Sequence, residues 1–281
     1  MARPRRIARG IELFPARTPT LPPATHTNSY ALGEREVLLV EPATPYDEER
    51  RAWLAWAREM PSTGRTPIAV FLTHHHHDHA GGAAFFASEL GLPIWAHPAT
   101  SARLPDLDVA RALHEGDGLI LDGPRPGCWR VLHTPGHAPG HLCLHDEEAG
   151  ALIAGDMVAS VGTILIEPQD GDMAEYLRQL ERLAALTPRV ALPAHGEPID
   201  DPVALLRRYV AHRLMREDKT ARALAPGGSA GARLEELVPV VYADTPVLLW
   251  PLARMSLEAH LIKLEREGRA RRTGERWTAG S

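Results

Sequence analysis

Residues 73–82 read THHHHDHAGG, and four ligand-type side chains in this run follow the spacing His-x-His-x-Asp-His. They are His74, His76, Asp78 and His79. Such a density of imidazole and carboxylate groups is hard to explain by packing, whereas both groups are common ligands of zinc and related metals. The run lies well inside the chain, which argues against an affinity tag or a surface histidine tract. It therefore predicts a metal-binding site.

The flanking residues place this run on a turn between a strand and a helix. Residues 67–72 (PIAVFL) are an unbroken apolar stretch typical of a buried strand, and the segment after the run has a helical pattern. In an extended turn, alternate residues point the same way, so His74 and His76 can hold one metal ion while the later ligands face another. His75 and His77 point away, and we expect them to be solvated or to support the ligands from behind.

Three later segments offer further ligands. Residues 133–141 (HTPGHAPGH) follow a strand-like run, and their Gly/Pro turn can bring His137 close to a metal ion. The apolar run 151–157 (ALIAGDM) contains Asp156, a carboxylate that is costly at the end of a hydrophobic strand unless a cation meets it. Another apolar strand ends at His195. These strand ends predict one edge of one sheet system.

In this order, the four motifs resemble the metallo-β-lactamase superfamily. They are His-x-His-x-Asp-His, Thr-Pro-Gly-His-x-x-Gly-His, Gly-Asp and Ala-His-Gly, and they span residues 73–196. One departure is Ala138, which stands where the second motif commonly has Thr. The change removes a hydroxyl and no ligand, so His137 is still expected to coordinate.

The resemblance implies a site with two metal ions. The first would be bound by His74, His76 and His137, the second by Asp78, His79 and His195, and Asp156 would bridge them. His141 matches the motif without being a ligand in the family, and we expect it to hold the turn.

Two zinc ions about 3.5 to 4 Å apart lower the pKa of a bridging water, so that hydroxide is available at neutral pH. We therefore expect a dinuclear zinc hydrolase that attacks with a metal-bridging hydroxide. Asp78 is the candidate catalytic residue, because a carboxylate on one metal can accept a hydrogen bond from that hydroxide and orient it. The sequence contains no G-x-S-x-G motif and no phosphate-cradling glycine loop.

Composition is that of a globular enzyme. The 281 residues are 44% hydrophobic, and the net charge of −5 excludes a globally basic nucleic-acid binder. Cys128 and Cys143 both lie in strand-like runs and are predicted to be reduced core residues. No signal peptide or membrane-spanning stretch is evident, so a cytoplasmic protein without membrane contact is expected. That location weakens an antibiotic-resistance role, as does Asp156, which stands where many zinc β-lactamases have cysteine.

The first 200 residues alternate strand-like and helix-like segments. Loops 17–28 and 158–170 have irregular composition and are expected to line the substrate pocket. Helices are predicted at about residues 46–60, 80–90 and 171–186; strands at 36–41, 67–72, 93–98, 119–122, 128–133, 141–146, 151–156 and 189–194. Periodicity alone gives an α/β class, and the resemblance implies a four-layer αβ/βα sandwich over residues 1–200.

Residues 201–281 form a separate, mainly helical domain. Helices are predicted at 203–224, 232–244 and 246–268, with a turn at 226–231 and a hairpin at 269–280. This pattern predicts a winged helix. YVAHRLMRED and EAHLIKLEREGRA resemble the carboxyl-terminal domain of the beta-lactamase-like protein 2 group, whose animal member is an endoribonuclease for single-stranded RNA.

The winged helix has a modest excess of basic residues. Seven basic and four acidic residues lie between positions 251 and 281. Arg269, Arg271 and Arg272 are candidates for nucleic-acid contact, but a solvated helix face or a packing or dimer module is favoured over it. A homodimer is thus among the expectations. Trp277 is expected to anchor the hairpin, and stacking on a base is the alternative.

Three functions follow from these observations. The first is hydrolysis of phosphodiesters in single-stranded RNA by two zinc ions. The second is hydrolysis of small thioesters, esters or lactones, as in the glyoxalase II branch, although no glutathione-site pattern is evident. The third, least favoured, is a mononuclear iron persulfide dioxygenase that uses the same turn.

Overall fold

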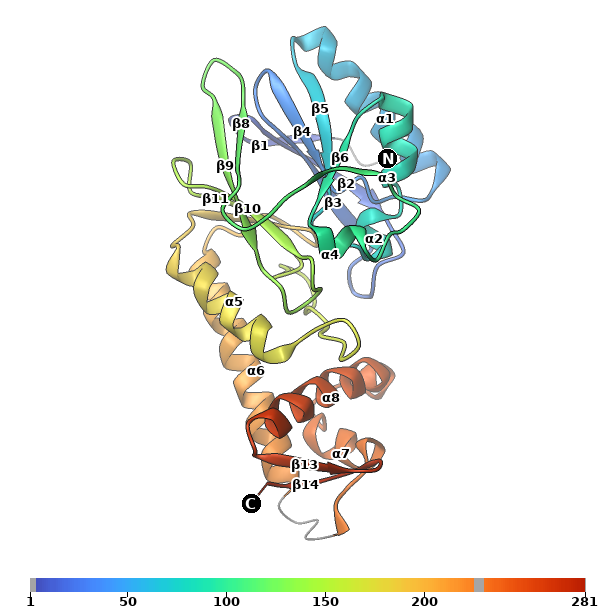
Figure 1. The fold of residues 1–281 in the computed structure, drawn as a ribbon, viewed down its shortest axis with the longest axis vertical. Coiled ribbons are helices and arrows are strands. Elements are labelled where there is room, and N and C mark those ends of the chain that lie inside the picture. The colour runs from blue at the N-terminus through green and yellow to red at the C-terminus, as the bar shows by residue number, and fades with distance from the viewer. Residues whose placement is uncertain (1–3, 225–229, 281) are drawn as a thin grey trace. The chain divides into compact units, whose positions relative to one another are not determined.

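Figure 1 shows a computed structural model of the chain, which describes residues 4–224 and 230–280. The chain divides into two compact units. The first comprises residues up to Thr134, with Pro139–Thr163 and Thr187–Pro202; the second comprises Pro135–Ala138, Ile164–Leu186 and the residues from Val203 onward. The domain boundary expected at residue 201 stays a prediction.

A seven-stranded mixed sheet forms one layer of the first unit. Its strands in spatial order are β1 (Arg5–Ala8), β2 (Ile11–Arg17), β3 (His26–Leu32), β4 (Glu36–Val40), β5 (Thr66–Phe71), β6 (Ile94–Ala96) and β7 (Val109–Ala112). The strands from β1 to β4 run antiparallel, and those from β4 to β7 run parallel. Parallel strands end at the same edge, so the histidine run after β5 lies at the carboxyl edge of this sheet.

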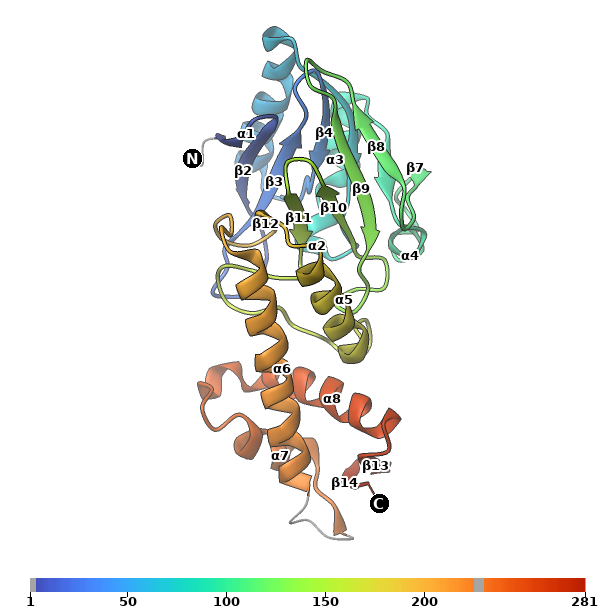
Figure 2. The same ribbon diagram turned by 90° about the vertical axis from the view of Figure 1, so that its left-hand side faces the viewer.

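The second sheet of this unit has five strands, and Figure 2 shows four of them, β9 to β12, side by side. Its order is β12 (Val190–Pro193), β11 (Ala151–Gly155), β10 (Leu142–Asp146), β9 (Gly127–His133) and β8 (Gly118–Leu121). Only β11 and β12 pair in parallel. Asp156 and His195 follow these two strands, so they leave the sheet at the same edge.

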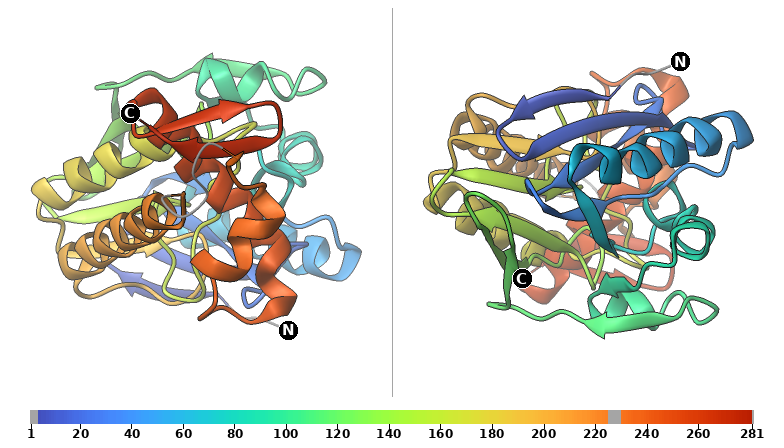
Figure 3. Two further views of the ribbon diagram at one scale, coloured as in Figure 1. Left: turned by 90° about the horizontal axis from the view of Figure 1, so that it is seen from below. Right: turned by 90° about the horizontal axis from the view of Figure 1, so that it is seen from above.

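Helices cover the outer face of the first sheet. The right-hand view of Figure 3 shows α1 lying along the strands. The helices of the first unit are α1 (Asp47–Glu59), the 3-10 turn η1 (Met60–Thr63), α2 (His77–Ala80), α3 (Ala83–Leu90) and α4 (Pro98–Ser101).

Strand β4 shows how the layers arise from the sequence. Val37 and Leu39 pack on the helix side with Trp53 and Phe86, whereas Leu38 and Val40 pack into the core between the two sheets. Because alternate residues point to opposite faces, a strand buried on both faces reads as a continuous apolar run. All of the strands predicted from apolar runs are present, and the α/β fold class is confirmed.

Four strands escaped the sequence prediction: β1, β2, β3 and β7. Strand β3 occupies part of the segment that we expected to be a loop, 17–28. Its sequence, HTNSYAL, is polar, yet Thr27, Asn28 and Ser29 are at most 3% exposed. Their side chains all donate to backbone carbonyls, so they can be buried without an apolar signal. The backbone N–H of Asn28 also donates to Ala194 O, which joins the two sheets.

The second unit contains the predicted winged helix. Its elements are α5 (Met173–Ala185), α6 (Pro202–Leu224, which begins at the last residue of the first unit), α7 (Leu234–Val241), the 3-10 turn η3 (Val247–Leu249), α8 (Trp250–Arg266), β13 (Ala270–Thr273) and β14 (Arg276–Ala279). Trp277 is 1% exposed within the apolar core, so it anchors the hairpin and is not available to stack on a base. Residues 226–229 of the predicted turn lie outside the described residues. Over the described residues, every helix is too short or too polar to cross a bilayer.

The two cysteines differ in a way that the sequence prediction missed. Neither cysteine is in a disulfide, and Cys143 is buried as expected, but Cys128 is exposed. Strand β9 turns Trp129 and Val131 toward the core, so the alternate residues Cys128 and Arg130 face outward. The prediction of a core position was wrong for Cys128.

This difference predicts two rates of thiol modification. A disulfide reagent should titrate one thiol per native chain rapidly, because only Cys128 is exposed, and a second one only in denaturant. The measurement is absorbance after addition of the reagent with and without urea. A Cys128→Ser variant should lack the fast phase. Two fast thiols in the native protein would contradict the burial of Cys143.

Candidate metal centre

The predicted ligands of the first unit come from the ends of strands in both sheets. His74, His76, Asp78 and His79 follow β5 and run into α2, whereas Asp156 and His195 follow β11 and β12. The sequence predicted one edge of one sheet system, and the structure draws the set from two sheets. The side chains are largely enclosed: His74 and His79 are fully buried, and Asp156 and His195 are 7% and 5% exposed.

These side chains converge in two overlapping groups. His74, His79 and Asp156 form one, and Asp78, His79 and His195 form the other; within each group, one ligand atom per residue lies within 4.8 Å of the others. Nε2 of His79 is 3.5 Å from Asp156 Oδ2 and 3.8 Å from Asp78 Oδ1. Nε2 of His195 is 3.4 Å from Asp156 Oδ1 and 3.6 Å from Asp78 Oδ2. Asp156 thus stands between two imidazoles, as a bridging residue would.

The donor set suits a metal ion. Nε2 of His79 is buried and makes no hydrogen bond, although it faces two carboxylates. Both of these carboxylates and both imidazoles offer lone pairs toward the same small space. Such groups repel one another unless a cation lies among them. The residues therefore could hold a metal.

His76 and His137 are the remaining predicted ligands. Nε2 of His74 lies 3.0 Å from Nδ1 of His76, so these two imidazoles converge. His137 falls in the stretch Pro135–Ala138, which groups with the second unit, and its Nδ1 donates to Leu165 O at 2.8 Å. Because Nδ1 carries the proton of this bond, Nε2 is the nitrogen that has a lone pair for a metal. Ligation by His137 stays a prediction.

His75 and His77, which the sequence predicted not to be ligands, take part in neither of the two groups described for the first unit. His77 is exposed at the start of α2, and His75 is half-buried with its ring 4.8 Å from that of His76. A helix begins at His77, so its side chain turns away from the strand-end ligands, as the spacing predicts.

Each buried imidazole of the predicted ligands in the first unit is also fixed through its other nitrogen. Nδ1 of His195 donates to the carbonyl of His26 at 2.9 Å. Nδ1 of His74 lies 2.9 Å from the hydroxyl of Thr73, and Nδ1 of His79 binds the carboxylate of Glu41. Bonds of this kind set the tautomer and the ring orientation of metal-binding histidines.

Glu41 is the functional residue that the sequence prediction missed. It is 1% exposed, has a φ of +57°, and also accepts a bond from the backbone N–H of Thr73 at 2.8 Å. A positive φ is costly for glutamate, so the surrounding structure must impose it. The signal was available: an acidic residue ends the apolar run EVLLVE, the same pattern that pointed to Asp156.

His141 holds the turn, as its motif position predicted. It is fully buried, its Nε2 accepts from the backbone N–H of Asp156 at 3.0 Å, and its Nδ1 lies 2.8 Å from the hydroxyl of Thr134. Gly155 has a φ of +48°, and a Cβ there would lie 2.5 Å from His141 Nε2. Glycine at this position therefore lets the imidazole orient the backbone of Asp156.

Charge within the centre shifts its pKa values in opposite directions. Burial lowers the pKa of His79, but the negative charges of Glu41, Asp156 and Asp78 outweigh burial and raise this pKa well above its usual value. Burial likewise lowers the pKa of His195, but the negative charge of Asp156 outweighs burial and raises this pKa above its usual value. Burial raises the pKa of Asp156, but His195 and His79 hold it well below the usual range. Without metal, the raised pKa values favour the protonated, positively charged forms of His79 and His195.

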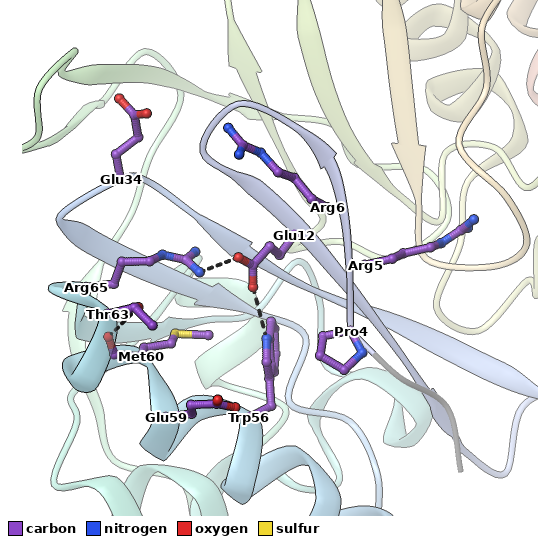
Figure 4. Close-up of a pocket in the computed structure, with 10 residues that line it drawn as sticks. All are labelled: Pro4, Arg5, Arg6, Glu12, Glu34, Trp56, Glu59, Met60, Thr63 and Arg65. Carbon is purple, nitrogen blue, oxygen red and sulfur yellow. Dashed lines mark hydrogen bonds and ion pairs between the residues drawn. The ribbon is translucent and has the colours of Figure 1, made fainter.

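A separate cavity of about 430 Å³ in the same unit contains none of the predicted ligands. Figure 4 shows that Arg65 and Trp56 both reach Glu12 across it. The ion pair between Arg65 and Glu12 spans 2.5 Å, and the indole N–H of Trp56 donates to Glu12 at 3.1 Å. Glu12, Arg65 and Trp56 therefore satisfy one another in this cavity.

Replacing Glu41→Gln should weaken metal binding with little change in fold. An amide cannot accept from both His79 and Thr73 as the carboxylate does, and it removes a negative charge. Loss of such a supporting partner typically weakens metal affinity about 10- to 100-fold. Competition with a chromogenic chelator measures the affinity.

Glu36→Gln is the matched control for this change. Glu36 is the first residue of β4, the strand that Glu41 directly follows, but it accepts from the backbone of Asp122, away from the predicted ligands. Its variant should bind metal as the unaltered protein does. Equal affinities for the Glu41 variant and the control would show that Glu41 does not support His79.

Metal binding should release protons near pH 6.5. The raised pKa values of His79 and His195 keep these imidazoles protonated at this pH, and a metal must displace the protons. Stability from the protonated imidazoles is present below about pH 6.5 and is lost as the pH rises through the folded-state pKa values. Affinity for added metal should therefore rise from pH 6 to 8. Calorimetry in two buffers of different ionisation enthalpy measures the released protons; pH-independent binding would contradict the shifts.

Comparisons with known proteins agree with this arrangement. The profile of the Metallo-beta-lactamase superfamily matches residues 22–195, and that of the Beta-lactamase associated winged helix domain matches residues 234–277. A Drosophila melanogaster protein named "Beta-lactamase-like protein 2 homolog" is 30% identical over 257 residues, or 87% of this chain and 84% of the relative. A Bacillus subtilis protein named "Probable metallo-hydrolase YqjP" is 28% identical over 217 residues, or 62% of this chain and 68% of the relative.

Solved structures lead to the same family. The crystal structure of a metallo-beta-lactamase family protein from Thermus thermophilus matches with a TM-score of 0.77 and 26% identity, and the match covers 98% of this chain and all of that one. With the ligand motifs in order, both profiles matched and a relative aligned over most of its length, the chain belongs to the metallo-beta-lactamase superfamily and carries its associated winged helix domain.

Proposed function

We propose that the protein is a dinuclear zinc hydrolase that cleaves phosphodiester bonds in single-stranded RNA. The observation that carries the proposal is the pair of overlapping ligand groups, which share His79 and place Asp156 between two imidazoles. A mononuclear site would leave Asp78 and His195, or else His74, without a metal to bind. Two ions, with His74, His76 and His137 on one and Asp78, His79 and His195 on the other, use every predicted ligand.

The chemistry of the side chains suits hydrolysis. Zinc ions, when bound, would supply hydroxide at neutral pH and positive charge for the leaving group. The side chain of Asp78 is 18% exposed, against 9% for Asp156, so Asp78 is the carboxylate that solvent and substrate reach. We assign it the role of orienting the attacking water by accepting its proton in a hydrogen bond. His74, His79 and His195 are held by partners on their far sides and act as fixed supports.

RNA is the preferred substrate because the winged helix resembles that of the beta-lactamase-like protein 2 group, and the Drosophila relative carries that name. The arginines in and beside the β13–β14 hairpin lend little support to RNA as the substrate. Arg269 pairs with Glu217 and Glu267, and the guanidinium of Arg272 lies over the ring of Trp277, 5.3 Å from its centre. Arg271 is the exposed arginine of the three without a described ion pair. Substrate contacts are therefore to be sought around the metal centre.

The other substrate classes use the same centre and are separated by experiment. Thioester, ester or lactone hydrolysis would appear as turnover of acyl-thiol and lactone substrates without RNA cleavage. An iron dioxygenase would contain one iron per chain and consume oxygen. Cytoplasmic location and a homodimer stay predictions.

The test of the proposal compares two neighbouring histidines. The zinc-loaded protein should cut a short single-stranded RNA, and His76→Ala should reduce the rate at least about 100-fold, because loss of a ligand removes a metal or misplaces it. His77→Ala is the matched control, since His77 is exposed one residue away. It should keep the rate within about three-fold, as expected for a surface substitution.

Elemental analysis accompanies the assay. Two zinc ions per chain are expected in the unaltered protein and fewer in the His76 variant. RNA that stays intact at all metal concentrations, or equal losses in the two variants, would refute the proposed activity.

A further inference from the structure

A groove of about 360 Å³ adjoins the predicted ligand His195 in the first unit. None of the predicted metal ligands is among its lining residues. The lining includes Pro15, Pro23, Thr25, His26, Asn28 and Val161.

The groove shares a wall with the metal centre. Gly196 and Glu197 also line it, and they directly follow His195 in the chain. The backbone carbonyl of His26 accepts the hydrogen bond from Nδ1 of His195 at 2.9 Å. A single layer of backbone therefore separates a molecule in the groove from a predicted ligand of the second metal.

The lining suits a flat, uncharged molecule. Pro15, Pro23 and Val161 offer apolar surface, which can pack against the face of a planar heterocycle. The carboxylate of Glu197 is already paired with Arg5. No other acidic or basic side chain, apart from the imidazole of His26, is among the described lining residues. A phosphate group would find no cation here, whereas a neutral ring would find a matching surface.

Asn28 supplies an unused hydrogen-bond acceptor. Its side chain is almost wholly enclosed, with 3% of the residue exposed. The amide nitrogen donates to Pro193 O at 2.9 Å and to Gly196 O at 2.7 Å, which fixes the side-chain orientation. Among the described residues nothing donates to Oδ1, this atom is not among the enclosed ones, and Asn28 is one of the residues that line the groove. A ligand with an N–H donor would satisfy it.

His26 offers a second polar contact at the entrance. Its Nδ1 lies 2.8 Å from the hydroxyl of Thr25, which leaves Nε2 to meet a ligand. The side chain is half-buried, so it can contact both the groove and the solvent. An acceptor inside and an imidazole at the entrance, between apolar walls, are the features that recognise the edge of a nucleobase.

We propose that this groove is a nucleobase subsite of the metal centre, which takes a base with an exocyclic amino group. The amino group donates to Asn28 Oδ1, and the ring packs against Pro15, Pro23 and Val161. The inference rests on the proposed hydrolysis of RNA, since a phosphodiester at the metals brings an adjoining base toward this groove. The same chemistry is shared by a base of single-stranded RNA and by a free nucleotide.

Binding to the metal-free protein tests the groove without reference to catalysis. Cytidine 5′-monophosphate should bind about ten-fold more tightly than ribose 5-phosphate, because stacking and a hydrogen bond depend on the base. Uridine 5′-monophosphate has no exocyclic amino group and offers only its ring N3–H as a donor, so it should bind roughly five-fold more weakly than the cytidine compound. Titration calorimetry or chemical-shift perturbation measures these ratios.

Val161→Phe fills the groove and should remove the preference for the cytidine compound. Thr63→Phe is the matched control, because Thr63 is exposed and lines the separate cavity of Figure 4. It should keep the full ratio. Thermal melting verifies that each variant is folded. If Val161→Phe does not fold, His26→Gln is the second variant, because it keeps the backbone carbonyl that holds His195. It should weaken binding of cytidine 5′-monophosphate several-fold.

Two results would overturn the proposal: equal binding of cytidine 5′-monophosphate and ribose 5-phosphate, or equal effects of Val161→Phe and Thr63→Phe. If RNA is cleaved, cuts beside cytidine, adenosine or guanosine should predominate over cuts beside uridine, and Val161→Phe should reduce this preference. If no RNA is cleaved but the binding ratios and the loss in Val161→Phe hold, the groove stands as a site for free nucleotides. In that case only the proposed RNA hydrolysis fails.

Discussion

The structure depends on one electrostatic constraint, the confinement of carboxylates among imidazoles at the buried edge of two sheets. Glu41, Asp78 and Asp156 all face His79, which is fully buried. Moving such charges out of water costs several kcal/mol each unless cations accompany them. Protonated histidines meet that need in part, and a metal ion meets it better, because it supplies more charge without a proton.

Much of this candidate centre could be predicted from sequence because the residues that could hold a metal are local or follow strand ends. The histidine run lies within a few residues, and Asp156 and His195 each follow an apolar run that marks its own strand. Glu41 also ends such a run, but no motif drew attention to it. Its role depends on a positive φ and on a contact with a residue 38 positions away, neither of which leaves a pattern in the sequence.

The fold was predictable where burial is apolar and not where it is polar. Strand β4 follows the rule, with four buried aliphatic residues on two faces. Strand β3 breaks it, because its buried Thr, Asn and Ser side chains bond to carbonyls of distant segments. Cys128 shows the complementary case. Its strand-like surroundings predicted a strand but did not predict which side chains face the core, and the structure turns Trp129 and Val131 inward. In the winged helix, apolar spacing and the Trp277 anchor were sufficient, whereas the ion pairs of Arg269 could not be anticipated.

The contacts of Asn28 limit which substitutions this protein can accept during evolution. One residue joins the two sheets through its backbone, fixes the segment after β12 through its amide nitrogen, and presents Oδ1 to the groove. A substitution there changes ligand chemistry and sheet assembly together, so selection cannot adjust one without the other. Thr25, Pro23 and Val161 carry no such double burden, since their side chains are exposed or half-exposed. Among related proteins, substitutions that change ligand preference should therefore accumulate at these peripheral positions, whereas the asparagine should be retained.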